Sequence, residues 1–291
     1  VIMMAATNRL ESLDTALLRP GRFDRSIYIR LPNFNERVAL FKVHLKQVPH
    51  TNIDLESLAG STYGFSGADI KNLVNEAALH AVKAKRKAVD KSDFFYAMDK
   101  IKLGLEVKSA IVSEEEKLLT AYHEAGHTIV GIFSPNYNYE FNKVTIGVRD
   151  ETLGVTHFES IGDNYGYSKA FIEDNIAMLL GGRLAEEMLV GKEHITTGAS
   201  NDLKIATELA EKMVVDWGFS DLGNNISFAV LDNYSSDLIH QEIKKILDAA
   251  QTKARSILES KRDKLDELAK ALVKKEILDR SEVMKILEVN Q

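Results

Sequence analysis

Apolar residues recur at three- and four-residue steps between residues 117 and 133, and two histidines interrupt them. This spacing predicts a long helix with one apolar face. His123 and His127 are four residues apart, so both rings project from the same side of that helix and can ligate one ion. Glu124 lies beside them. The pattern His-Glu-x-x-His on a helix is typical of metallopeptidases.

The chain contains no cysteine, so neither a disulfide nor a thiolate metal site can exist. Any transition metal must be held by histidine and carboxylate. The competing interpretation is that the two histidines are polar residues with protein partners on a packed helix. Gly126 argues for a special environment, because a glycine inside a helix costs about 1 kcal/mol relative to alanine. We therefore expect another backbone or the substrate to approach closely there.

A zinc site for catalysis needs a third protein ligand and an open position for water. The spacing of the sequence does not choose among five candidates: Asp202, Glu186, Glu187, His157 and His194. Asp202 begins a predicted helix, where an acidic residue is also an ordinary cap, so the ligand and cap interpretations are comparable.

The chemistry that follows from such a site is peptide hydrolysis. Zinc lowers the pKa of its bound water to about 7, and Glu124 would accept the proton and then protonate the leaving amine. Two alternating segments, 143–148 and 153–158, predict a hairpin. An extended peptide could dock on its edge through main-chain hydrogen bonds, although a purely structural hairpin explains the pattern equally well.

The chain of 291 residues is long enough for two folding units. Residues 1–6 are an apolar run without alternation, which predicts a strand buried on both faces, and a second apolar segment covers 27–31. Because such a strand needs neighbours, we expect the N-terminus to be truncated. A helix is predicted at 36–45, and Ser66 with Asp69 forms a capping signature. A second helix follows Ser92, so 54–102 reads as a small helical unit.

The region after residue 102 lacks periodicity, and a domain boundary is expected near residue 107. Helices are predicted at 114–133, 168–190 and 201–216. The segment 236–272 carries apolar residues at helical steps and predicts one long amphipathic helix or a helix pair. We interpret its alternating charges as a solvated face in preference to a partner surface.

Charge and hydropathy argue against nucleic-acid binding and against a membrane helix within this sequence. The net charge of −6, with both signs interspersed, offers no broad basic surface, which argues against nucleic-acid binding. No apolar run approaches the roughly 20 residues of a membrane helix, and residues 1–6 are too short for a signal peptide.

Several motifs in order resemble a known family across nearly the whole chain. AATNR at 5–9 and ALLRPGRFDR at 16–25 resemble the second region of homology of an AAA+ ATPase, and GFSGAD at 64–69 resembles the start of its lid. In combination with HEAGH at 123–127, GGRLAEE at 181–187 and TGASND at 197–202, they are similar to the FtsH-like zinc proteases.

The resemblance implies a multi-domain fold: a partial α/β AAA+ core at 1–53, a helical lid at 54–107, and a mainly helical zinc protease domain with a hairpin at 108–291. It implies zinc bound by His123, His127 and Asp202, with Glu124 catalytic. Glu186 and Glu187 then take supporting roles. It also implies a nucleotide sensor at Asn8 and arginine fingers, acting on a neighbouring subunit's ATP, at Arg19 and Arg22.

The family works as a hexamer on unfolded or membrane polypeptides, through a membrane anchor, so the resemblance implies a homo-oligomer. The phosphate-binding loop G-x-x-x-x-G-K-[ST] does not occur, so ATP and Mg²⁺ are expected as cofactors of the full-length protein only. HITTG at 194–198 favours the mitochondrial inner membrane over a plastid or bacterial plasma membrane. Two alternatives are a non-proteolytic AAA+ remodelling module with an inert metal site, and a structural hexamerisation domain.

Overall fold

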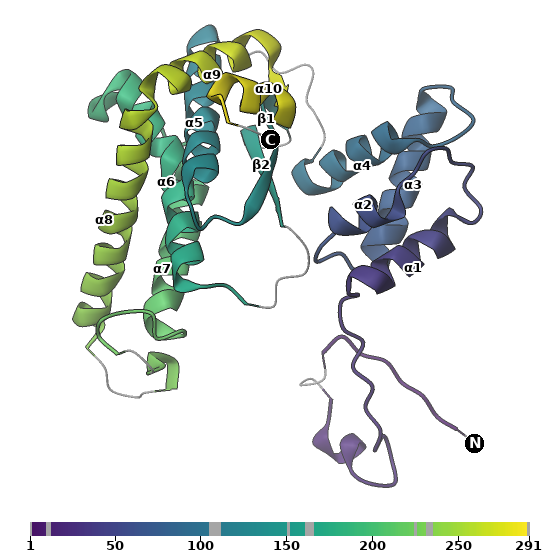
Figure 1. The fold of residues 1–291 in the computed structure, drawn as a ribbon. Helices are drawn as coiled ribbons and strands as arrows, with labels where there is room; N and C mark the ends of the chain where they lie inside the picture. Colours follow the sequence, from purple (N-terminus) through teal and green to yellow (C-terminus); the bar gives the residue numbers. More distant parts are fainter. Residues whose placement is uncertain are drawn as a thin grey trace.

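The computed structural model describes residues 2–9, 13–104, 112–149, 152–160, 166–223, 226–230 and 235–289. These residues build two separate hydrophobic cores. The first core lies among α1 (Phe34–Leu45), α2 (Leu55–Gly60), α3 (Gly67–Lys83) and α4 (Lys91–Leu103). The second lies among the remaining helices and one small sheet. Figure 1 shows helices α1 to α4 as a group apart from the remaining helices and the sheet. The expected boundary at residue 107 falls outside the described residues.

The N-terminal segment differs from the expectation of two buried strands. Within 2–9 and 13–33 the structure assigns only the 3-10 helix η2 (Thr15–Leu18). Ile2 and Ile29 are 90% and 96% exposed. The strand predictions for 1–6 and 27–31 are therefore wrong for the chain as described, because a strand forms only where a partner strand supplies ladder hydrogen bonds.

Local signals place the helices of the first core. Ser66 and Asp69 form the predicted capping box at the start of α3, and Asn33 with Glu36 forms another at the start of α1. The predicted helix at 36–45 is confirmed as α1, and the helix expected after Ser92 begins at Lys91. The short helix α2 was not predicted, because six residues are too few to show a period.

The helix α5 (Glu114–Phe133) has the predicted bounds and packs on α6 (Lys169–Val190). A methyl group added at Gly126 would meet the carbonyl oxygen of Gly181 and would lie 2.7 Å from the Cβ of Ala185. The prediction that another backbone approaches Gly126 is thus confirmed. Gly126 and Gly181, which face each other, let α5 and α6 approach closely.

This close approach makes Gly126→Ala a sensitive test of the packing. Alanine favours a helix by about 1 kcal/mol, but overpacking at a backbone contact costs about 1–3 kcal/mol. We expect Gly126→Ala to destabilise the second core, measured by denaturant unfolding with Trp217, the one tryptophan, as the fluorescent probe. Gly166→Ala is the control, because no atom of a described residue beyond its chain neighbours lies within 4 Å of its added methyl. Equal stability of both variants would contradict the packing argument.

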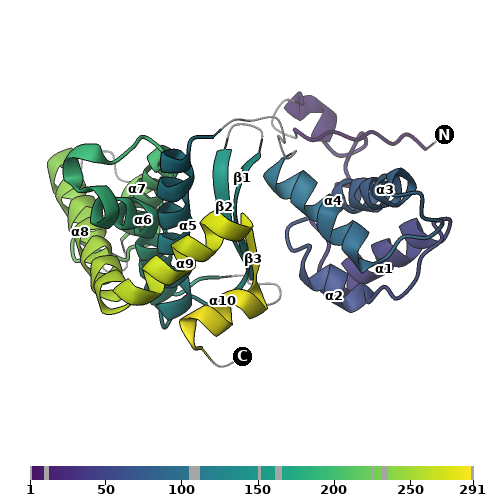
Figure 2. The same cartoon turned by 90° about the horizontal axis from the view of Figure 1, so that it is seen from above.

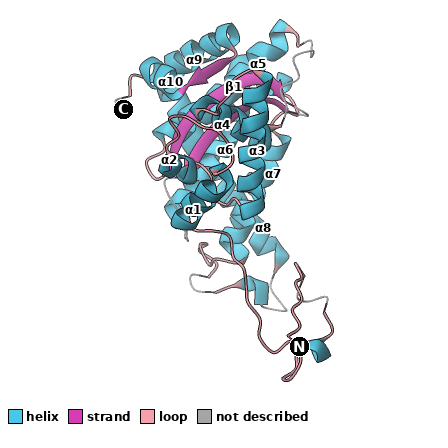
Figure 3. Ribbon diagram, turned by 90° about the vertical axis from the view of Figure 1, so that its right-hand side faces the viewer, coloured by secondary structure: helices cyan, strands magenta, loops and turns pink. Residues whose placement is uncertain are grey.

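The sheet joins distant parts of the chain. It is antiparallel in the order β2–β1–β3, formed by β1 (Tyr139–Arg149), β2 (Thr152–Ser160) and β3 (Ile277–Asp279) (Figure 3). The hairpin prediction is confirmed, whereas β3 was not predicted because three residues carry no readable alternation. Phe158 lies against the glycine surface of α5 at Gly131. The hairpin therefore packs directly on the helix that carries the histidines.

The C-terminal part completes the second core. The helices α7 (Ser200–Val215), α8 (Ser236–Ser260), α9 (Arg262–Lys275) and α10 (Arg280–Leu287) follow α6, with the 3-10 turns η3 (Lys192–His194) and η4 (Phe228–Val230) between them. Figure 2 shows α9 and α10 beside the sheet. The segment 236–272 is a helix pair that breaks at Lys261. Part of its charged face is not simply solvated, since Arg255 bonds Glu187 and Lys253 bonds Asp174 of α6.

Within the described part of the chain, no helix combines the length and apolar character needed to cross a bilayer.

Candidate metal centre

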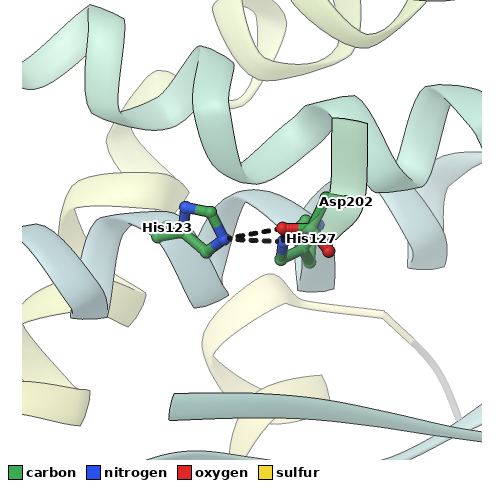
Figure 4. A group of neighbouring side chains, drawn as sticks. All are labelled: His123, His127 and Asp202. Carbon is green, nitrogen blue, oxygen red and sulfur yellow. Dashed lines mark hydrogen bonds and ion pairs between the residues drawn. The ribbon is translucent and has the colours of Figure 1, made fainter. Parts of the chain in front are cut away.

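Two elements bring three ligand atoms together beneath α6. His123 and His127 project from one face of α5, and Asp202 lies in the first turn of α7 (Figure 4). The two Nε2 atoms are 3.0 Å apart, and Asp202 Oδ2 lies 3.4 Å from that of His123 and 3.6 Å from that of His127. In the described residues this is the one group of three or more such ligands that could hold a metal ion.

The opposite ring nitrogens are held by protein acceptors. His123 Nδ1 lies 2.7 Å from Glu186 Oε1, and His127 Nδ1 lies 2.8 Å from the carbonyl oxygen of Met178. Both acceptors require an Nδ1–H, which leaves the lone pair of each neutral ring on Nε2. Glu186 is oriented in turn by the backbone N–H of Thr196 at 3.0 Å and by its hydroxyl at 3.1 Å. The rings are thus arranged as metal ligands before any metal binds.

Charge in the site is balanced between imidazole and carboxylate. Burial opposes a charge on His123, but hydrogen bonds to Asp202 and Glu186 outweigh it and raise the pKa of His123 to about 10. Burial opposes the ionised form of Asp202, yet its contacts with the two histidines hold the pKa of Asp202 below its usual value. Without a metal the site therefore retains a proton on imidazole, which a bound cation would replace.

Gly182 of α6 covers the ligand atoms. A methyl group added there would lie 2.5 Å from His127 Nε2 and 2.6 Å from His123 Nε2. Only a residue without a side chain leaves room at these nitrogens. The donor set of two imidazoles and a carboxylate, together with this space, fits a zinc ion with a further open position.

Glu124 lies next to the ligands and is 5% exposed. Thr156 of β2 donates its one hydroxyl hydrogen to Glu124 Oε2 at 2.6 Å, and the Glu124 carbonyl oxygen lies 3.0 Å from the same hydroxyl oxygen. A methyl group added at Gly154, which has φ +83°, would come within 2.7 Å of the Glu124 carboxylate. Burial raises the pKa of Glu124. The carboxylate is therefore held against β2 and is disposed to accept a proton.

The other four candidates for the third ligand lie elsewhere or have other partners. Glu186 binds the outer nitrogen of His123, and Glu187 bonds Arg255 at 3.1 Å. His157 Nδ1 lies 3.7 Å from Glu159, and His194 lies in the exposed turn η3. The cap interpretation of Asp202 is wrong, because α7 begins at Ser200, two residues earlier, with Ala199 as its N-cap.

The three residues with expected nucleotide roles stand apart from this centre. Asn8, Arg19 and Arg22 lie in exposed loop segments of the N-terminal part. The Arg22 guanidinium donates to the carbonyl oxygen of Ala16 at 2.8 Å. Their assignment to nucleotide binding stays a prediction.

Sequence reasoning missed the residues that support the centre: Gly154, Thr156, Met178, Gly182 and Thr196. One signal was available, since Gly181 and Gly182 are adjacent glycines inside a predicted helix and such residues mark close approach. Nothing local distinguishes Thr156 from other strand threonines.

Comparison with known proteins agrees with this geometry. The model of peptidase family M41 matches residues 110–286, which contain all three ligand residues and Glu124. The chain belongs to peptidase family M41. The AAA+ lid domain matches residues 52–95, and the ATPase family associated with various cellular activities matches residues 1–31. The predicted family and the helical lid followed by a helical M41 domain are therefore confirmed.

Relatives of this M41 chain are named ATP-dependent zinc metalloprotease FtsH. The protein of Rhodothermus marinus is 44% identical over 99% of this chain and 43% of its own length. The protein of Caulobacter vibrioides is 42% identical over 99% of this chain and 49% of its own length. That of Buchnera aphidicola from Acyrthosiphon pisum is 41% identical over 100% of this chain and 51% of its own length. The chain spans about half the length of the curated relatives it matches. Zinc is the metal of the family, and the mitochondrial branch stays a prediction.

The hydrogen bond between Glu186 and His123 predicts that a change at Glu186 lowers metal affinity although Glu186 itself is not a metal ligand. Removing an outer hydrogen-bond partner of a metal-binding histidine typically lowers affinity 10–100-fold. We expect Glu186→Gln to lower zinc affinity by about tenfold or more in competition titrations against a chromogenic chelator. Glu187→Gln is the matched control, since this neighbour bonds Arg255. Equal zinc affinity of the two variants would refute the role of Glu186.

Proposed function

We propose that this chain is the peptidase part of an ATP-dependent zinc endopeptidase, with zinc held by His123, His127 and Asp202. The observation that carries the proposal is the convergence of these three ligand atoms beside a buried carboxylate, that of Glu124. When bound, zinc supplies Lewis acidity to a water molecule and to the peptide carbonyl.

The protein's own groups move the proton. Glu124 accepts a proton from the attacking water and returns it to the leaving amine, so it ends each turnover in its starting state. Its raised pKa allows it to hold the proton between these two steps. The hydroxyl of Thr156 keeps one oxygen of the Glu124 carboxylate engaged, which fixes the direction of the other.

The sheet offers a place for an extended substrate. In the described sheet β2 pairs with β1 alone, which leaves its other edge open. A polypeptide that adds there would use main-chain hydrogen bonds and place little demand on sequence, as a protease of unfolded proteins requires. The same strand supplies Thr156 and Gly154 against Glu124, so a docked chain would run past the catalytic carboxylate.

The proposal for the whole protein is broader. ATP and Mg²⁺ serve its AAA+ module, Asn8 senses the nucleotide, and Arg19 and Arg22 act on the neighbouring subunit's ATP. The domains divide at 1–53, 54–107 and 108–291. Its subunits form a hexamer that degrades unfolded and membrane polypeptides and does not bind nucleic acid. A membrane anchor attaches the whole protein to a membrane. We favour the mitochondrial inner membrane over a plastid or bacterial plasma membrane. The relatives' name and the AAA match support the ATP-dependent part.

Metal removal tests the peptidase proposal. We expect about one zinc per chain and cleavage of casein, an unfolded protein, that a chelator stops and added zinc restores. Bound zinc without any cleavage would favour the non-proteolytic remodelling module, and a preparation that binds no zinc would refute the metal assignment. Light scattering separates a monomer from a ring and so tests the hexamer independently.

A further inference from the structure

A pocket lies beside two of the helices that frame the metal centre. It has a volume of about 190 Å³ and opens among α6, α7 and α8. Its walls are largely aliphatic, formed by Leu180, Leu184, Leu203 and Leu247. Arg183 directly follows Gly182, and Leu203 directly follows Asp202, so the pocket and the metal centre share two helices.

A cation without a partner lines this apolar pocket. The Nε atom of Arg183 is buried and has no hydrogen-bond partner among the described residues. Buried polar atoms in native proteins are nearly always paired, so this guanidinium lacks the acceptors that a structural arginine has. Arg183 as a whole is part-exposed, so an anion would meet the accessible part of the side chain and not the buried Nε atom. The two acids that follow along α6 do not serve. Glu186 binds His123 at 2.7 Å, and Glu187 directs its carboxylate to Arg255 at 3.1 Å. The guanidinium of Arg183 is thus available to an incoming anion.

The walls restrict which anion fits. A guanidinium pairs best with a planar carboxylate, which accepts two parallel hydrogen bonds. Gln251 of α8 contributes an amide at the same pocket. The leucines favour an aliphatic group next to the charge, since burial of apolar surface is the main favourable contribution there. A phosphate would also meet the guanidinium, but its remaining oxygen atoms would lose their water against these leucines without gaining polar contacts in return.

We propose that this pocket binds a carboxylate that carries a short branched aliphatic group, as at the C-terminus of a peptide that ends in leucine. Arg183 binds the carboxylate, Gln251 contacts its polar side, and the four leucines surround the side chain. The proposal concerns binding and stands apart from the peptidase activity.

N-acetyl-L-leucine is the probe, titrated into the full chain and followed by saturation-transfer NMR and calorimetry. We expect saturable binding, and binding of N-acetyl-L-leucinamide that is weaker by about tenfold or more, because the amide removes the charge that Arg183 recognises. 4-Methylpentanoate, which is the same molecule without the acetamido group, distinguishes the sources: equal binding assigns the pocket to free aliphatic acids, and weaker binding assigns it to peptide C-termini. Absence of binding by N-acetyl-L-leucine, or equal binding of its amide, overturns the proposal.

Three variants locate the binding. Arg183→Met keeps the aliphatic stem, removes the charge, and is expected to weaken binding by about tenfold or more. Thr207→Trp, at an exposed lining position, fills the pocket and is expected to weaken binding even if Arg183→Met does not fold. Lys192→Met removes one exposed charge at the end of α6 and should bind as the unmodified chain does. Unchanged binding in folded Arg183→Met or Thr207→Trp places the ligand elsewhere and refutes the proposal.

Discussion

Glu124→Gln is expected to lower kcat for peptide cleavage by about 10²–10⁴-fold, the usual contribution of a general acid–base group. Glutamine has nearly the same shape and can still accept the hydrogen bond of Thr156, but its amide cannot take up the proton of water. The three ligand residues are untouched. Zinc content and the stability of the second core should therefore stay at the level of the unmodified chain.

Cleavage of a fluorescent casein, together with metal analysis of the same samples, measures this effect. Glu115→Gln is the matched control, because Glu115 is exposed in the first turn of the same helix. It should cleave as the unmodified chain does. A Glu124→Gln protein that retains zinc and full activity would remove Glu124 from the mechanism while leaving the metal site intact.

Gly182→Ala has the largest expected effect on metal binding. Its methyl group would lie 2.5 and 2.6 Å from the two histidine nitrogens that face Asp202, which is closer than any carbon approaches a nitrogen without a bond. Either the rings or α6 must shift, and the lone pairs then no longer converge on one point. We expect zinc affinity to fall by about a hundredfold or more, beyond the 10–100-fold typical of a lost outer partner.

Zinc affinity by chelator competition tests this expectation, and unfolding followed by Trp217 fluorescence separates loss of the site from loss of the fold. Gly166→Ala controls for the added methyl, since no described residue other than its chain neighbours comes within 4 Å of it. If Gly182→Ala bound zinc as tightly as this control, the space at Gly182 would have no part in the centre.

Local features of the chain were predictable where the physical cause is local. The capping box at Ser66 and the bounds of α5 follow from hydrogen bonds and periodicity within a few residues. The hairpin follows from alternation on either side of a short turn. No strand forms in the described residues 2–6 or in 27–31, because apolar composition creates a strand only when another strand pairs with it. The strand β3 pairs with β1 from more than 130 residues away and left no local signal.

In the candidate metal centre, too, the sequence determined the local geometry and the tertiary structure determined the contacts between distant residues. The sequence by itself determined that His123 and His127 share one face of a helix with Glu124 beside them, because the period of the helix sets that geometry. Only the tertiary structure decided which carboxylate joins them. Asp202 and Glu186 both lie more than 55 residues after His127 in the chain. The packing of α6 on α5, and of α7 on α6, brings Asp202 to the Nε2 atoms of the two histidines and Glu186 to Nδ1 of His123. Contacts between distant segments depend on how whole faces pack, and residue spacing does not encode this.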